Sequence, residues 1–184
     1  MLPNLTEFIF PANFGCTIIT ENLILPNIYN VSISLVPIET SQNNIGLGFK
    51  KLRYFVEYSL QNCILISKEN PLFDSISQME NNIVVLPTEP YDYWTGSVLL
   101  SKLSAITEKY FHIDCISIDS MVGDNVQYVI SHPEECGLEL EGDHWWNMDT
   151  LNTGSESDIT WDDLNVGGGT KWSPKIVKGG LSEN

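Results

Sequence analysis

The stretch CILISKENPLFDSISQMENNIVVLP, residues 63–87, decides the fold class, because two apolar segments flank a short segment with helical character. CILIS (63–67) and IVVLP (83–87) are almost continuously apolar, which is typical of strands that are covered on both faces. Proline is tolerated in a first helical turn, so PLFDSISQME (71–80) is predicted to be a short helix. This part of the chain therefore predicts a sheet with helices packed against it.

Further strands are predicted on both sides of this stretch. Residues 31–35 alternate between apolar side chains and serines, which indicates a half-buried strand. Residues 15–20 predict an earlier strand, and ENLILPN is expected to connect the two. Residues 111–119 and 126–130 predict a hairpin around a loop that contains glycine and aspartate.

Two longer helices complete the predicted elements. Apolar residues recur at helical spacing over residues 49–61 and again over residues 91–109. Gly96 lies inside the second helix and costs about 1 kcal/mol there relative to alanine. Its presence indicates either a neighbour that packs closely against the helix or an irregular first turn.

These elements predict an α+β fold, with a mixed or antiparallel sheet and about three helices, over a compact domain of residues 1–136. Residues 137–184 contain eight of the 13 glycines and almost no aliphatic periodicity. We expect them to form a largely irregular acidic tail that is flexible or docked on a partner.

The charge balance limits the classes of partner. The chain has 24 acidic and 9 basic residues, a formal net charge of −15, which disfavours direct nucleic-acid binding. It favours a protein partner with a basic surface, although acidity also serves solubility alone. The chain shows no signal peptide and no apolar run near the ~18–20 residues of a membrane span, so a soluble intracellular protein without membrane contact is expected. Four cysteines without a CxxC pair are expected to be free thiols, mostly buried.

Three stretches carry a resemblance to a known family. LPTEPYDYWTGSVLLSKLSAITE (86–108), SIDSMVGDNVQYVI (117–130) and HWWN (144–147) resemble a family of small acidic proteins from tailed bacteriophages. The resemblance spans about a third of the chain and implies synthesis in an infected bacterium. It implies no activity.

Two groups of residues have the side chains of a metal site. His132, Cys136 and His144, with the acids Glu134, Glu135 and Asp143, are ligand types that zinc accepts, but their spacing matches no standard finger. A polar turn is the alternative interpretation, and we assign no metal or cofactor.

Three acids of the predicted hairpin, Asp114, Asp119 and Asp124, are ligand types for Mg²⁺. Strand alternation predicts that Asp114 shares a face with His112, Ile116 and Ile118. Solvated edge and turn residues are the alternative. A metal-dependent hydrolase or nuclease stays a second alternative function on these residues.

Lys50, Lys51 and Arg53 form the one tight basic cluster in the sequence. We expect them in the first turn of a helix, where positive charge opposes the helix dipole. The conflict suggests contact with an anion or with the acidic tail, and a solvated helix start is the alternative.

The tail contains SDITWDDLNVGGGTKW (157–172), in which apolar residues lie among aspartates next to a flexible glycine run. Such a segment inserts an aromatic anchor into a partner while its aspartates meet a basic rim. Two neighbouring tryptophans upstream cannot both point inward from a strand, so they are expected to clamp the start of the tail. The residues predicted to contact the partner are Trp145, Trp146, Ile159, Trp161, Asp162, Asp163, Leu164 and Trp172. The alternative is a fixed arm, in which Trp161 and Trp172 pack on their own domain.

We interpret the chain as a non-enzymatic phage accessory protein that binds, and inhibits or adapts, a host or phage protein through its acidic surface and tail. It would act in the cytoplasm of the infected bacterium or in association with the virion. The first alternative is a structural virion or assembly subunit, a homo-oligomer whose copies exchange the C-terminal arm.

Overall fold

The structure is a computed structural model that describes residues 7–38, 41–79, 82–123, 125–131, 140–154 and 161. Within these ranges a six-stranded sheet has the order β4-β3-β1-β2-β5-β6. Its strands are β1 (Phe8–Ile19), β2 (Ile24–Pro37), β3 (Cys63–Ser67), β4 (Ile83–Leu86), β5 (Phe111–Ser120) and β6 (Tyr128–Ile130). The helices are α1 (Gln42–Tyr54), α2 (Phe73–Ser77) and α3 (Asp92–Thr107). A π-helical turn, Phe55–Ser59, continues α1.

The sheet is mixed, because β3 pairs in parallel with β1 and β4 while the other neighbours are antiparallel. The predicted α+β class with a mixed sheet and three helices is therefore confirmed. None of the helices in the described ranges is long and apolar enough to cross a bilayer.

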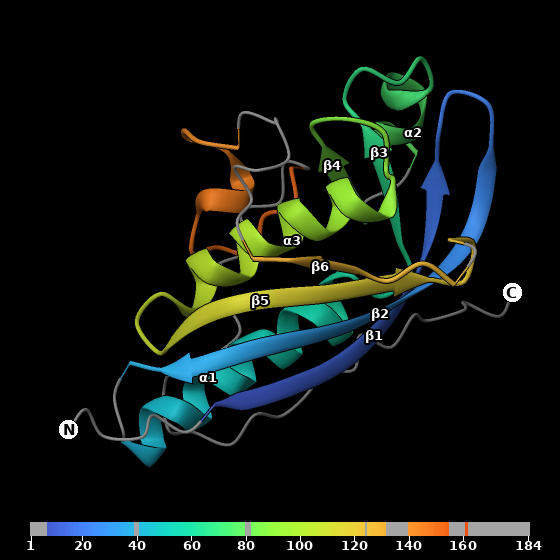
Figure 1. Cartoon of the computed structure of the whole chain (residues 1–184). Coiled ribbons are helices and arrows are strands. Elements are labelled where there is room, and N and C mark those ends of the chain that lie inside the picture. Colours follow the sequence, from blue (N-terminus) through green and yellow to red (C-terminus); the bar gives the residue numbers. More distant parts are fainter. Residues whose placement is uncertain are drawn as a thin grey trace, which may run out of the picture.

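The two faces of the sheet differ in their cover (Figure 1). Helices α1 and α3 lie along one face, where they bury the main core with Phe14, Ile33 and Ile116 from the strands. Helix α2 contributes to a second, smaller cluster with Ile66 and Val85 of β3 and β4. Strands β3 and β4, which come from residues 63–87, are therefore covered on both faces, and this explains their continuous apolar character.

The hairpin of β1 and β2 is longer than predicted. Its pairing runs from Phe8 opposite Leu35 to Ile19 opposite Ile24, so ENLILPN is largely strand and not a connector. Pro11 and Pro26 obscured this signal in the sequence. Residues 8–15 of β1 have no second strand partner in the described part of the chain, and such an edge tolerates a proline.

The chain departs from its predicted course at the start of α1. This helix begins at Gln42, seven residues before the predicted start, so Lys51 and Arg53 lie in its last turn. Both residues lie far from the helix N-terminus, so the predicted conflict with the dipole is wrong.

A second departure is a bulge in β5. Ser34 pairs with Cys115 and Leu35 pairs with Ile113, so Asp114 has no opposite residue. The extra residue reverses the alternation, which leaves Asp114 exposed while Ile116 and Ile118 are buried. The prediction that these three share a face is wrong for this reason.

Gly96 has the close neighbours that its place in a helix suggested. A Cβ atom there would lie 2.5 Å from Ile130 Cδ1 and 2.7 Å from Ile118 Cγ2. The absent side chain lets α3 approach β5 and β6, and the close-packing interpretation is confirmed.

We expect Gly96→Ala to lower the free energy of unfolding by about 1–3 kcal/mol, because overpacking outweighs the gain in helix propensity. Urea denaturation measures this change. Gly46→Ala in α1 is the matched control, since no atom lies within 4 Å of a Cβ there, and it should stabilise the protein by up to about 1 kcal/mol. Equal effects of the two substitutions would contradict the packing explanation.

Candidate functional site: the C-terminal arm

We use "arm" for residues 140–154 together with Trp161. The arm lies beside α3 (orange and red in Figure 1), and Leu140, Leu151 and its three tryptophans belong to the main core. The predicted domain boundary falls within residues 132–139, outside the described residues. Core residues therefore continue beyond that predicted boundary.

Trp145 and Trp146 are both buried, which a strand would not permit. They lie in a 3-10 helical turn, Trp145–Asn147, and their ring planes meet at 78°. The Trp146 Nε1–H donates to Leu140 O at 2.9 Å, and the His144 ring stacks on the Trp146 ring. This turn directs two successive indoles into the same core from different angles.

The arm also covers the edge of the sheet at β4. Trp145 Nε1–H donates to Val85 O at 2.8 Å, and Val85 N–H donates to Thr153 O at 2.8 Å. The Thr153 hydroxyl donates to Ile83 O at 2.6 Å. These contacts satisfy backbone groups that an edge strand otherwise leaves open to pairing with another chain. The arm is therefore part of the architecture of the sheet.

Lys102 of α3 fastens the arm from within. Its side chain is fully buried, and its Nζ donates to Trp145 O and Met148 O at 2.8 Å each. The rings of Phe55 and Trp145 lie 5.7 and 5.5 Å from Nζ. Burial lowers the pKa of Lys102 to about 7, and nearby Asp149 opposes this shift in part. A neutral amine still has two N–H donors, which matches the two carbonyl acceptors.

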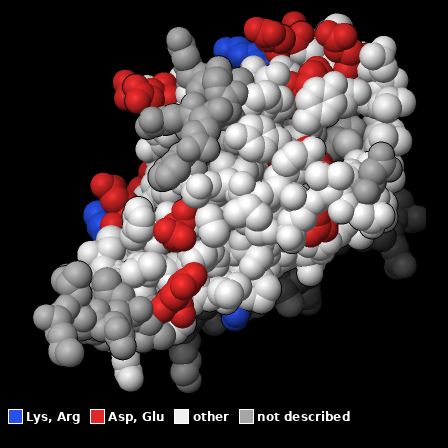
Figure 2. Space-filling model, in the orientation of Figure 1, with Lys and Arg blue, Asp and Glu red and all other residues white. Residues whose placement is uncertain are grey.

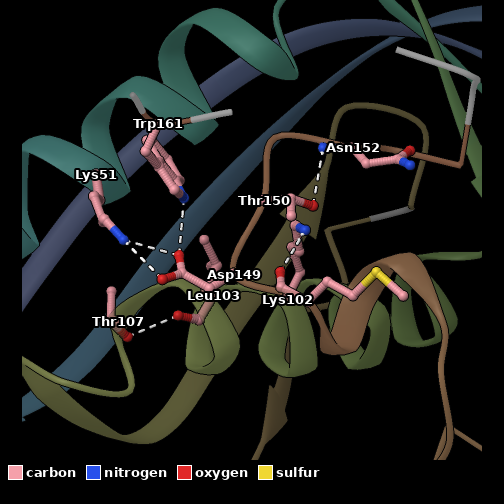
Figure 3. Close-up of polar contacts among 9 residues, drawn as sticks. Lys51, Lys102, Leu103, Thr107, Asp149, Thr150, Asn152 and Trp161 are labelled. Carbon is pink, nitrogen blue, oxygen red and sulfur yellow. Dashed lines mark hydrogen bonds and ion pairs between the residues drawn. The ribbon is translucent and has the colours of Figure 1, made fainter. Parts of the chain in front are cut away.

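Asp149 joins the arm to α1 (Figure 3). Lys51 Nζ donates to its two carboxylate oxygens at 2.8 and 3.0 Å, and Trp161 Nε1–H donates to its Oδ1 at 2.8 Å. Lys51 Nζ also lies 4.8 Å from the centroid of the Trp161 ring, and the planes of the Trp161 and Tyr54 rings meet at 74°. One carboxylate thus holds a lysine and a tryptophan from segments far apart in sequence.

We expect the pair of Lys51 and Asp149 to couple by about 1 kcal/mol, because the lysine is largely sequestered while the aspartate stays partly exposed. A double-mutant cycle of Lys51→Met and Asp149→Asn in urea denaturation measures this coupling. Arg53→Met with Glu57→Gln is the control pair, since both side chains are solvent-exposed and Arg53 Nε lies 3.5 Å from Glu57 Oε1. The coupling of this pair should stay below about 0.5 kcal/mol. Equal coupling in the two cycles would refute the difference in burial as the cause.

The other predicted site residues have mixed placements. Lys50 and Arg53 are exposed on α1, whereas Lys51 contacts the arm. Ile159, Asp162, Asp163, Leu164 and Trp172 lie outside the described residues. In this structure Trp145, Trp146 and Trp161 are buried in the chain's own core. For Trp161 this is the arrangement of the fixed-arm alternative, whose other residue, Trp172, is not described.

The residues considered for chemistry are not assembled into a metal site in the described part of the chain, where no group of three or more His, Cys, Asp or Glu side chains could hold an ion. His132, Glu134, Glu135, Cys136 and Asp124 lie outside that part. Cys16 and Cys63 are free and buried, as expected, and burial raises the pKa of Cys16 to about 12.

Sequence reasoning missed Lys102, Asp149 and Thr153. Lys102 left a detectable signal, because it is a single lysine between Leu99 and Ile106 on the apolar face of a helix. Asp149 and Thr153 left none, since their roles depend on where the arm returns to the sheet.

No protein-family model matches the chain, and no curated protein matches it. Among solved structures, 6-pyruvoyl tetrahydropterin synthase from Plasmodium vivax is similar with a TM-score of 0.46 and 11% identity, over 68% of this chain and 96% of that chain. The uncharacterized protein WS1659 from Wolinella succinogenes gives a TM-score of 0.45 and 10% identity, over 69% and 98%. Similarity at this level is distant and carries no argument about activity.

Proposed function

We propose that this chain is a non-enzymatic binding protein that engages a protein partner through an acidic surface. The observation that carries the proposal is the charge of the molecule, −15 over 184 residues. Figure 2 shows acidic groups recurring across the visible face, while lysine and arginine appear at few points on it. Such a surface attracts a basic partner and speeds its association.

Two of the few basic residues are turned away from solvent, which increases the excess of acidic over basic groups on the surface. Lys102 is fully buried beneath the arm, and Lys51 is engaged by Asp149. In the described part of the chain this leaves Lys50, Arg53, Lys68 and Lys109 as exposed cations. The acids Glu21, Glu69, Asp74 and Glu108 are exposed, and none has an ion-pair partner there. A partner with basic surface would compensate this excess.

The phage resemblance extends the proposal to a biological setting. On this proposal the chain is an accessory protein in an infected bacterium, where it inhibits or adapts a host or phage protein. The structural-subunit alternative predicts instead that copies of the chain exchange their arms. The two differ in what the purified protein does alone, because arm exchange makes its apparent mass rise with concentration.

Affinity capture from lysate of the bacterial host tests the proposal. The tagged chain is compared with a variant in which Glu21, Asp74, Glu108, Asp114 and Asp119 become amides. We expect a basic protein that is retained at low salt, released near 0.5 M salt where the Debye length is only a few Å, and lost from the neutralised variant. Equal retention by the two baits would refute the proposal. Light scattering of the tagged chain alone tests the structural-subunit alternative, which predicts an apparent mass that rises with protein concentration.

A further inference from the structure

The face of the sheet opposite α1 and α3 carries a groove of about 480 Å³. It crosses the middle of β1 and β2 and the C-terminal part of β5, where the strand register places Asn13, Asn30 and Asp119 in one row. Pro11, Ser32 and Ser117 form the next row. Three of the lining residues are apolar: Pro11, and Ala12 and Val31, whose side chains alternate toward the helix-covered face. The other lining side chains are polar, and they belong to Asn13, Asn30, Ser32, Ser117, Asp119 and Gln127. The groove is therefore a set of hydrogen-bonding groups around one carboxylate.

Asp119 is half-buried in this groove, and its carboxylate can accept further hydrogen bonds. Its Oδ1 accepts a hydrogen bond from Asn30 Nδ2 at 2.8 Å, and its other oxygen has no partner among the described residues. Two further acids, Glu7 and Asp114, belong to the same face. None of the six described strands contains a lysine or an arginine. The negative charge of this face is thus not compensated by the sheet.

Apolar side chains surround the charged centre. Ile9, Ile28 and Val129 are 68%, 46% and 66% exposed, and all three point away from the helices. Val129 is opposite Ser117, at the border of the groove. Exposed apolar residues gathered on one face mark interaction sites, and apolar contacts around a polar anchor are the usual composition of an interface.

We propose that the sheet face with this groove binds a basic segment of the partner, with an arginine side chain in the groove against Asp119. A guanidinium has five N–H donors in a planar fork, so it can pair with the carboxylate while the remaining donors meet side-chain oxygens of Asn13, Ser117 or Gln127. The flanking apolar residues of the segment then contact Ile9, Ile28 and Val129. This inference rests on the proposed function and assigns it a surface.

NMR titration of the full chain tests the assignment. The probe is the peptide acetyl-Gly-Val-Arg-Val-Gly-amide at about 50 mM salt, where charge interactions extend beyond ~10 Å. Its control is the same peptide with citrulline in place of arginine, which keeps the shape and removes the charge. We expect amide shifts centred on Asn30, Ser117 and Asp119, and binding about tenfold weaker with citrulline.

Protein variants locate the anchor. Asp119→Asn should weaken arginine-peptide binding about tenfold, whereas Asp74→Asn on α2, with the same change in net charge, should alter it less than twofold. Ser117→Lys supplies a second test, because a lysine beside Asp119 competes with the peptide for its carboxylate and should weaken binding at least as much.

Three results would overturn the inference. Shifts spread over all acidic residues, or equal losses from Asp119→Asn and Asp74→Asn, would show non-specific attraction. Arginine-dependent binding at another surface would reject this face and leave the proposed function intact. Absence of any binding, together with failed salt-dependent capture from lysate, would remove the proposed function as well.

Discussion

Replacing Lys102 with methionine is expected to lower the free energy of unfolding by about 2–4 kcal/mol. Methionine fills a similar volume but cannot donate to Trp145 O and Met148 O. Trp145 O then keeps only the longer bond from Met148 N–H at 3.3 Å, and a buried acceptor that loses its donor costs about 1–3 kcal/mol. Urea denaturation gives the change, with Lys109→Met at an exposed position as the control within about 0.5 kcal/mol. A variant as stable as the wild type would show that the two carbonyls find other partners.

The same substitution should remove a pH dependence. The pKa of Lys102 is about 7 in the folded protein, against an ordinary value of 10.5, so the unfolded chain binds more protons between these limits. Stability from this group therefore rises with pH between about 7 and 10.5, and it does not change further below about 7, where both states bind the proton. The difference in stability between wild type and Lys102→Met should grow from pH 6 to pH 8.5. The buried thiols, whose pKa values are raised, contribute equally to the pH dependence of both proteins, so their contribution cancels in this difference.

Trp145→Ala should destabilise the protein by about 3–5 kcal/mol, since it opens a large cavity in the core. It also removes the donor to Val85 O at the edge strand β4. We expect faster hydrogen exchange at the β4 amides, and aggregation that rises with protein concentration, because the edge becomes free to pair with another chain. Calorimetry and hydrogen exchange measure the two effects.

Trp145→Phe separates the two contributions, because it keeps an aromatic ring but removes the N–H. It should lose less stability than Trp145→Ala and still show faster exchange at Val85. If Trp145→Ala destabilised the fold while the β4 amides stayed protected, the indole would act only as core volume.

Both predictions concern how firmly the arm is held, and this bears on the proposed function. Trp145 and Trp161 contribute to the core in the structure, so a partner that used them would first have to displace them. No described residue covers the groove on the opposite face of the sheet, so a partner bound there would displace none of them. Hydrogen exchange on the arm, with and without the captured partner, distinguishes the two routes.

Composition and periodicity were sufficient for the fold class and for most of its elements. CILIS was predicted to its exact bounds as β3, and the hairpin of β5 and β6 and the long helix α3 were predicted within a few residues. A short apolar run bounded by turn residues is typical of a strand buried on both faces, so local chemistry was enough to predict it. The same reasoning predicted that something packs closely against Gly96.

The strand order, the bulge at Asp114 and the burial of Lys102 depended on contacts between distant segments. A single extra residue reversed the faces of β5, because alternation has a period of two and carries no record of a bulge. The ion pair of Lys51 and Asp149 joins residues 98 positions apart. No pattern in either segment encodes its partner, so the attachment of the arm was decided by tertiary packing, which brings those side chains within reach of each other.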